Sequence, residues 1–332
     1  MTDSIKLLGI SNAIVDVLAH VDEDFLAKIG APRGSMTLID EARAHEIYDL
    51  MGPATEMSGG SVANTVAGFA NLGGAAAYIG RVKDDQLGEI FGHDMRSLGV
   101  DVRLRPATDG SPTARCHVLI DPDGQRTMQT YLGACTELSV SDITPETVGH
   151  PAVILLEGYV WDIAEGPALA SAAINIAKKN GSKVALSLSD SFCVERHRDA
   201  FDAAVRGGVD IVVADEDEVA ALLQTGSHEE TMDALGNYDN LFAMTRSEKG
   251  SVVIHGSETV IQPATPVEEI VDTTGAGDAY SAGFLYGWTD GKTLQECAEL
   301  GTFCATQVIQ QIGGRIEPGL MEDYLAASRQ PA

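Results

Sequence analysis

The 332-residue chain is poor in basic residues, with 22 Lys and Arg against 49 Asp and Glu and a formal net charge of −27 when histidine is neutral. A protein that neutralises nucleic-acid phosphates or docks on anionic lipid needs a basic face. The composition therefore argues against both kinds of partner. The sequence also has no apolar run of about 18 residues, so it predicts no membrane span.

Cysteine is scarce too, and its five positions are scattered and form no Cys-x-x-Cys pair. This pattern argues against a disulfide framework or a zinc site and fits reduced thiols. No basic segment followed by a long apolar segment opens the chain. We therefore expect no signal peptide and a cytoplasmic protein.

The first 131 residues contain many short extended segments and several helices. Proline and glycine in Asp121-Pro-Asp-Gly124 are typical of a tight turn, because proline presets one dihedral and glycine tolerates a positive φ. The two flanking strands then form a hairpin, which we expect to join the early strands in a small separate sheet. Apolar spacing predicts helices over 40–50, 61–72 and 84–98 and strands over 5–10, 13–20, 37–39, 75–79, 101–105, 114–120 and 126–131.

From residue 152 short apolar strands alternate with helices, which is typical of a parallel sheet. We expect one α/β domain over residues 1–332, with a discontinuous β lid from about 13–39 and 101–131. The predicted elements of this half are strands over 153–156, 183–188 and 210–214, helices over 164–180, 195–206 and 215–224, a hairpin-like region over 241–261, and helices over 276–289 and 293–311.

The strongest motif is Asp272-Thr-Thr-Gly-Ala-Gly-Asp278, which lies between an extended run and a helix. The first N–H groups of a helix are unpaired and favour an anion, and Gly275 and Gly277 let a phosphate approach without a Cβ clash. Asp278 would also serve as a simple capping carboxylate, but a cap does not account for the paired glycines. The motif therefore predicts an anion hole.

A second motif, Ser58-Gly-Gly-Ser-Val-Ala-Asn64, opens an earlier helix. It presents the Asn64 amide, which can both donate and accept hydrogen bonds with hydroxyl groups. The alternative is a glycine turn with a polar cap. The residues Gly80, Asp84, Asp85 and Gly88 follow it in the chain.

With these motifs in this order, the chain resembles the ribokinase (PfkB) family of carbohydrate and nucleoside kinases, essentially from end to end. The resemblance implies a ribokinase-like α/β fold, with a central, mostly parallel sheet flanked by helices and a small β-sheet lid. Within the family it is most similar to adenosine-kinase-like members, on the segments 9–16, 131–138, 157–162 and 189–193.

The resemblance implies an acceptor site in which Asp16 binds the ribose hydroxyls, as a carboxylate does strongly. Arg126 would reach the transferred phosphate, with a solvated hairpin charge as the alternative. Tyr159 and Trp161 would stack on a purine, with core packing as the alternative. The complete predicted acceptor site is Asn12, Asp16, Gly59, Gly60, Asn64, Arg126 and Tyr159.

The catalytic roles implied by the resemblance fall on the glycine motif. Asp278 would be the general base for a sugar hydroxyl, and the amides of Gly275, Ala276 and Gly277 would stabilise the γ-phosphoryl oxygens of ATP. Lid closure would exclude water.

For the nucleotide and its ions, Glu218 matches the glutamate of the family's Asn-x-x-Glu motif, which organises Mg²⁺ through water. Asp215 replaces the asparagine of that motif. The remaining implied positions are Thr245, Ser247 and Gly250 for ATP, where Ser247 replaces a glycine, and Asp272 and Thr274 beside a monovalent-cation site that K⁺ would fill.

The sequence thus predicts an ATP-dependent kinase that phosphorylates the 5′-hydroxyl of a nucleoside, with adenosine as the first choice. Two alternatives stay open, namely a family sugar kinase acting on fructose, ribose or a keto-deoxy sugar acid, and a silent nucleotide-binding regulator. The expected partners are the small acceptor and ATP, and the chain would be a monomer or a homodimer.

Overall fold

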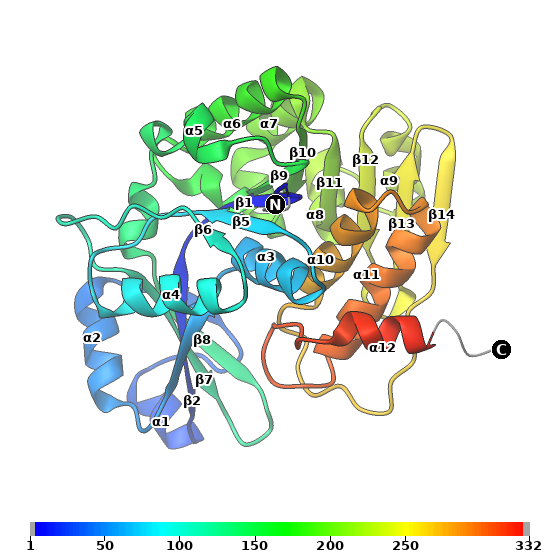
Figure 1. Cartoon of the computed structure of the whole chain (residues 1–332). Helices are drawn as coiled ribbons and strands as arrows, with labels where there is room; N and C mark the ends of the chain where they lie inside the picture. Colours follow the sequence, from blue (N-terminus) through cyan, green and yellow to red (C-terminus); the bar gives the residue numbers. More distant parts are fainter. Residues whose placement is uncertain (1–3, 328–332) are drawn as a thin grey trace.

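The computed structural model describes residues 4–327, which form two sheets and their covering helices (Figure 1). The large sheet has nine strands in the order β14-β13-β12-β11-β10-β9-β1-β5-β6. All neighbours from β6 to β12 are parallel, whereas β13 and β14 are antiparallel additions at one edge. The predicted ribokinase-like, mostly parallel sheet is therefore confirmed. Its strands are β1 (Leu7–Ile10), β5 (Ala76–Ile79), β6 (Asp101–Val102), β9 (Val153–Glu157), β10 (Lys183–Ser187), β11 (Ile211–Asp215), β12 (Leu241–Thr245), β13 (Ser251–His255) and β14 (Glu258–Gln262).

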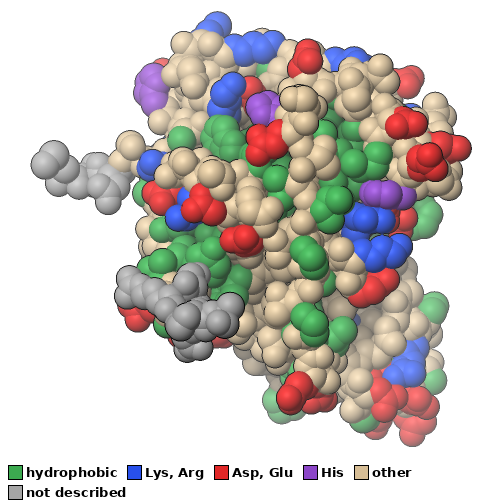
Figure 2. All heavy atoms as spheres, turned by 90° about the vertical axis from the view of Figure 1, so that its right-hand side faces the viewer, with side chains coloured by type: hydrophobic (Ala, Val, Ile, Leu, Met, Phe, Trp, Pro, Cys, Tyr) green, Lys and Arg blue, Asp and Glu red, His purple; other side chains and the backbone are tan. Residues whose placement is uncertain are grey.

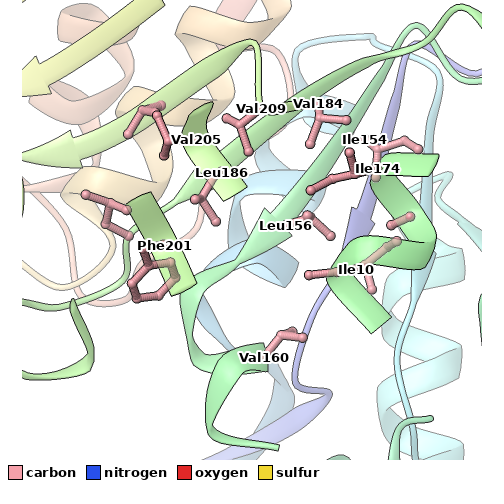
Figure 3. Close-up of a cluster of buried hydrophobic side chains, with 14 of the residues drawn as sticks. Ile10, Ile154, Leu156, Val160, Ile174, Val184, Leu186, Phe201, Val205 and Val209 are labelled. Atoms are coloured by element: carbon pink, nitrogen blue, oxygen red, sulfur yellow. The ribbon is translucent and has the colours of Figure 1, made fainter. Parts of the chain in front are cut away.

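Helices cover both faces of this sheet (Figure 1). Its central strands β1 and β9 are buried along their whole length and are mostly apolar, as expected for strands covered on both faces. Figure 3 shows one face, where Leu156 and Leu186 lie in one buried cluster with Ile174 and Phe201. That face is covered by α5 (Pro145–Val148), α6 (Gly166–Asn180), α7 (Ser191–Gly208), α8 (Glu216–Leu223) and α9 (His228–Leu235). The other face is covered by α3 (Ser61–Asn71), α4 (Gln86–Ser97), α10 (Ala276–Thr289) and α11 (Leu294–Val308).

The small sheet has five strands in the order β3-β8-β7-β2-β4. The predicted hairpin is present, with Gly124 at φ +79 donating to the Asp121 carbonyl at 2.9 Å. Two details differ from the prediction. The segment expected at 101–105 forms β6 and pairs with β5 in the large sheet, and β4, which was not predicted, completes the small one. The strands are β2 (Ile14–His20), β3 (Met36–Leu38), β4 (Thr55–Gly59), β7 (Ala114–Ile120) and β8 (Arg126–Tyr131).

Most predicted helices are found close to their expected bounds, because their caps and apolar spacing agree. Helix α2 (Glu41–Leu50) begins after the predicted N-cap Asp40, and α10 spans the predicted residues 276–289. Four helices were not predicted, namely α1 (Glu23–Lys28), α5, α9 and α12 (Leu320–Ala327). Each is short, with only four to eight residues, so its apolar period is hard to recognise.

Charge on the surface is mixed, as the composition predicts. On the face shown in Figure 2, small groups of basic side chains lie among acidic ones. None of the helices within residues 4–327 is long and apolar enough to cross a membrane.

Polar side chains gather where the parallel strands end. Asn12 follows β1, Glu157 ends β9, Asp190 follows β10, Asp215 ends β11 and Thr245 ends β12. These strands are parallel neighbours, so their carboxyl ends share one edge of the sheet. Ligands of open α/β sheets bind at that edge.

Candidate active site

The N-terminus of α10 carries the two glycines of the strongest motif, and glycine suits these two positions for different reasons. Gly275 is the N-cap and has φ +74, and a Cβ there would lie 2.4 Å from the Gly314 Cα. Gly277 is exposed, and a Cβ there would meet no atom of residues 4–327 within 4 Å. The expectation that both glycines keep space for an anion therefore applies to Gly277, whereas Gly275 is required by backbone conformation and close packing.

The helix start also presents free donors. Within residues 4–327 the backbone N–H groups of Gly277 and Asp278 donate to no other residue, while that of Ala276 donates to the Thr273 carbonyl at 3.2 Å. Unpaired N–H groups at a helix N-terminus are a ready site for an anion. The predicted anion hole thus has two open donors in this conformation.

Asp278 lies in the first turn of α10 and faces α3. Its carboxylate accepts a hydrogen bond from Ser61 Oγ at 2.7 Å and one from Asn64 Nδ2 at 3.2 Å. Burial raises the pKa of Asp278 to about 6, against the lowering effect of these two bonds and of Arg315. A carboxyl with this pKa is ionised at neutral pH. Its pKa is also close enough to neutral pH for the carboxylate to accept a proton in a reaction.

Asp16 lies on β2 opposite β4, where Gly59 leaves room for it. A Cβ on Gly59 would lie 2.3 Å from the Asp16 carboxyl carbon. Burial raises the pKa of Asp16 to about 6, and the charges of Arg315 and Arg126 partly oppose that rise. Gly59 therefore determines whether this carboxylate fits.

Asn12 and Gly60 complete this corner. Gly60 has φ +95, and a Cβ on it would come within 2.8 Å of the Asn12 carbonyl oxygen. The Asn12 side chain is 4% exposed, and its Oδ1 accepts no hydrogen bond from residues 4–327. A buried acceptor without a partner is costly and suits a ligand hydroxyl. The structure thus brings together five of the predicted acceptor residues, Asn12, Asp16, Gly59, Gly60 and Asn64.

Arg126 begins β8 in the small sheet and forms an ion pair with Asp272 in the loop before α10. The two side chains are only 9% and 7% exposed. Asp272 also accepts the N–H groups of Thr274 and Gly313, each at 3.0 Å. Arg126 therefore connects the small sheet to the loop before α10, and both Asp272 oxygens are already engaged.

At the carboxyl end of β11, Asp215 and Glu218 form a capping box at the start of α8. Each carboxylate accepts the other residue's backbone N–H, at 2.8 and 2.9 Å. Burial, and next the Asp215 charge, raise the pKa of Glu218 to about 8, and burial also raises the pKa of Asp215. The acidic run is thus a capping box, and it lies at the same sheet edge as the anion hole.

The predicted ATP loop follows β12. Ser247 has φ +50, in the left-handed region that favours glycine, which accounts for a glycine being usual there. Gly250 has φ +87, and a Cβ on it would lie 2.0 Å from the Gln262 carbonyl oxygen. Thr245 ends β12 next to Asp215 of β11. These residues form one turn at the binding edge.

The two aromatic residues that were expected to stack on a purine differ in their surroundings. Trp161 is 3% exposed and its ring lies 4.9 Å from that of Phe201, so it packs in the core and the stacking expectation is wrong for it. Tyr159 is half-buried against the same core. Burial and a hydrogen bond with Asp190 raise the pKa of Tyr159.

Three residues of the site were not predicted. Arg315 donates from Nε to Asn64 Oδ1 at 2.8 Å, and Ser61 binds Asp278. Glu157 is 1% exposed and accepts the Val62 N–H at 3.3 Å, and burial raises the pKa of Glu157 to about 8. Ser61 carried a signal, because it directly follows Gly60 at a helix start, and Glu157 opens a segment that carries the family resemblance. Arg315 lies in none of the motifs.

A mostly parallel sheet with an open helix N-terminus beside a half-buried carboxylate, under a small sheet, defines a phosphotransferase that acts on alcohols. Residues 37–318 match the model described as pfkB family carbohydrate kinase. The chain belongs to this family.

Individual relatives agree with this assignment over nearly the whole chain. The crystal structure of adenosine kinase from Sinorhizobium meliloti is 46% identical, with a TM-score of 0.89, over 98% of this chain and 99% of that one. A probable sugar kinase from Rhizobium etli CFN 42 is 43% identical, with a TM-score of 0.90, over 99% of each. The adenosine kinase of Saccharomyces cerevisiae is 26% identical over 94% of this chain and 96% of its own.

Proposed function

We propose that the protein is an ATP-dependent kinase that phosphorylates the 5′-hydroxyl of adenosine and gives AMP and ADP. The observation that carries this proposal is Asp278, a half-buried carboxylate with a pKa of about 6 in the same helix turn as the free N–H of Gly277. Similarity to adenosine kinases supports the choice of acceptor. The 43% identity to a probable sugar kinase makes a free sugar the second candidate.

In the proposed reaction Asp278 accepts the proton of the acceptor hydroxyl as that oxygen attacks the γ-phosphorus of ATP. General base catalysis contributes typically about 10²–10⁴-fold. The backbone N–H groups of the 275–278 turn stabilise the charge on the transferred phosphoryl oxygens. Arg126, once released from Asp272, is the cation that the lid brings to the same phosphoryl group.

The acceptor is held by the corner that Asn12 and Asp16 form. The Asp16 carboxylate accepts two neighbouring hydroxyls, and the unpartnered Asn12 Oδ1 accepts a third donor. Gly59 and Gly60 leave the space that this requires, and the small sheet covers the site and excludes water. Tyr159 is assigned to the acceptor, and Thr245, Ser247 and Gly250 to ATP.

Magnesium fits this site as a companion of ATP. Among residues 4–327 no group of three His, Cys, Asp or Glu is arranged to hold a metal ion. Mg²⁺ commonly binds through substrate phosphates, water and one or two carboxylates, and Glu218 at the binding edge supplies one. When bound, the ion neutralises charge on the phosphates. A monovalent cation at Asp272 and Thr274 does not fit this conformation, because Arg126 and two N–H groups already engage the carboxylate.

We also infer a cytoplasmic enzyme of purine salvage. The five cysteines are all buried and unpaired, which suits a reducing compartment.

A coupled ADP-release assay with adenosine, ribose, fructose and 2-keto-3-deoxygluconate tests the proposal. We expect the highest kcat/KM with adenosine. Turnover with sugars alone would show that the protein is a sugar kinase and not an adenosine kinase. Tight ATP binding without turnover of any acceptor would identify a silent nucleotide-binding regulator instead.

A further inference from the structure

Arg315 connects two segments of the acceptor site from a distant part of the chain. It lies in the loop between α11 and α12, beyond the last predicted helix. Its Nη2 donates to Ser58 Oγ at 2.8 Å and to the Ser58 carbonyl, and its Nε donates to Asn64 Oδ1 at 2.8 Å. The guanidinium group thus joins the end of β4 to the first turns of α3.

The bond to Asn64 fixes which way its amide points. Because Oδ1 accepts from Arg315, the amide nitrogen is turned towards Asp278, to which it donates at 3.2 Å. With the amide reversed, its NH₂ would face the guanidinium donors and its oxygen would face a carboxylate, so both contacts would be repulsive. Arg315 therefore keeps Asn64 in the orientation that donates to Asp278.

Arg315 is also the cation shared by the acidic groups here. Asp16, Asp94 and Asp278 all interact with it electrostatically. Asp278 in turn raises the pKa of Asp16, Glu157 and Glu218 by its charge, and Arg126 lowers the pKa of Asp16. Removing Arg315 therefore takes away the cation that lowers the pKa of both Asp16 and Asp278, and leaves Arg126 as the other cation that lowers the pKa of Asp16.

We propose that Arg315 is a positioning residue for the reaction, which orients the base Asp278 through Asn64 and lets Asp16 and Asp278 carry their charges together. This inference rests on the proposed function, and nothing in it requires contact between Arg315 and the substrate. It predicts two separable effects of Arg315, one on geometry and one on charge.

The test compares Arg315→Met and Arg315→Lys with a matched control, Arg103→Met. Arg103 likewise donates to backbone carbonyls of another segment, those of Thr147 and Val148, and contacts none of the site residues. For Arg315→Met we expect kcat to fall about 10²-fold at alkaline pH, as for a misplaced catalytic group, and the acid limb of kcat/KM to move up by about one pH unit. Arg315→Lys should restore the acid limb and leave kcat reduced. Arg103→Met should keep the wild-type profile.

Combination with Asn64→Ala separates positioning from general damage. At alkaline pH, where both carboxylates are ionised, the double variant should be no slower than Asn64→Ala alone, because Arg315 acts through Asn64. Additive losses, or a wild-type pH profile in Arg315→Met, would overturn the proposal. Absence of turnover in the wild type would instead reject the proposed function.

Thermal stability measured against pH tests the electrostatic role of Arg315 even if the wild type shows no turnover. Burial raises the pKa of both carboxyls, so the folded state holds more protons than the unfolded state and stability falls as pH rises through that range. In Arg315→Met this fall should extend to higher pH than in the wild type or in Arg103→Met. Parallel curves of thermal midpoint against pH would contradict the electrostatic role.

Discussion

The Asp16 carboxylate occupies the space where a side chain of Gly59 would begin. A Cβ on Gly59 would lie 2.3 Å from the carboxyl carbon and from one carboxylate oxygen. The two residues come from paired strands, β2 and β4, so neither can move without disturbing the sheet. This contact makes the acceptor site sensitive to a single methyl group.

Gly59→Ala should therefore displace Asp16 and raise KM for the acceptor about 10-fold or more, with a smaller effect on KM for ATP, because one charge-assisted hydrogen bond is worth about 1.5–3 kcal/mol. Initial rates at varied acceptor and ATP concentrations measure this split. Gly207→Ala is the control, since a Cβ there meets nothing within 4 Å. Equal KM values in Gly59→Ala and wild type would show that Asp16 does not bind the acceptor.

The two glycines of the α10 turn should respond differently to alanine. Gly275→Ala has to adopt φ +74 against Gly314, so it should lose at least about 1–3 kcal/mol of stability. Gly277→Ala should fold normally, because its Cβ points into open space, and lose kcat because the methyl group occupies the phosphoryl position. Thermal unfolding and ADP release measure the two effects. Full activity of Gly277→Ala would exclude this turn as the anion hole.

The central strands of the large sheet were predictable because they are buried on both faces and form mostly apolar runs in the sequence. β4 was not, because Thr55–Gly59 is short, polar and ends in glycine, and it becomes a strand only by pairing with β2. β6 has two residues, and its place in the large sheet depends on β5. The neighbouring strand, rather than local propensity, thus decides whether an edge segment becomes a strand and which sheet it joins.

The candidate site, like the sheets, has residues that the sequence reveals and residues that only the fold reveals. The motif residues Asp278 and Asn64 are recognisable because glycines mark their turns. Arg315 is 251 positions from Asn64 and has no local pattern, so only the fold reveals their contact. Trp161 shows the converse, because an aromatic residue near the binding edge is equally suited to the core, where it lies.

Ser61→Ala should make the enzyme more sensitive to acid. The Ser61 hydroxyl donates to Asp278 at 2.7 Å and lowers its pKa, so its removal raises that pKa above the present value of about 6. The acid limb of kcat/KM should therefore move up by about one pH unit, with little change in rate at pH 8.5. Ser171→Ala, at an exposed position of α6, is the control. An unchanged acid limb would mean that another group controls it.

Asp278→Asn should lower kcat by about 10²–10⁴-fold, because an amide cannot accept the proton of the acceptor hydroxyl. ATP binding should be nearly unchanged, since the free N–H groups of the turn stay in place. Single-turnover kinetics and ATP titration by calorimetry measure these two quantities. Turnover at the wild-type rate would refute the role of Asp278 as the base.

Asp215→Asn should change how magnesium use depends on pH. The Asp215 charge is, after burial, the largest contribution that raises the pKa of Glu218 to about 8, so its removal lowers that pKa. Asparagine caps a helix as well as aspartate does, so α8 should remain intact. The half-saturating Mg²⁺ concentration of the wild type should fall as pH rises from 6.5 to 9, because Glu218 becomes ionised. In the variant the half-saturating Mg²⁺ concentration should reach its lowest value at a lower pH. Identical pH dependence in both proteins would mean that Glu218 does not take part in holding the ion.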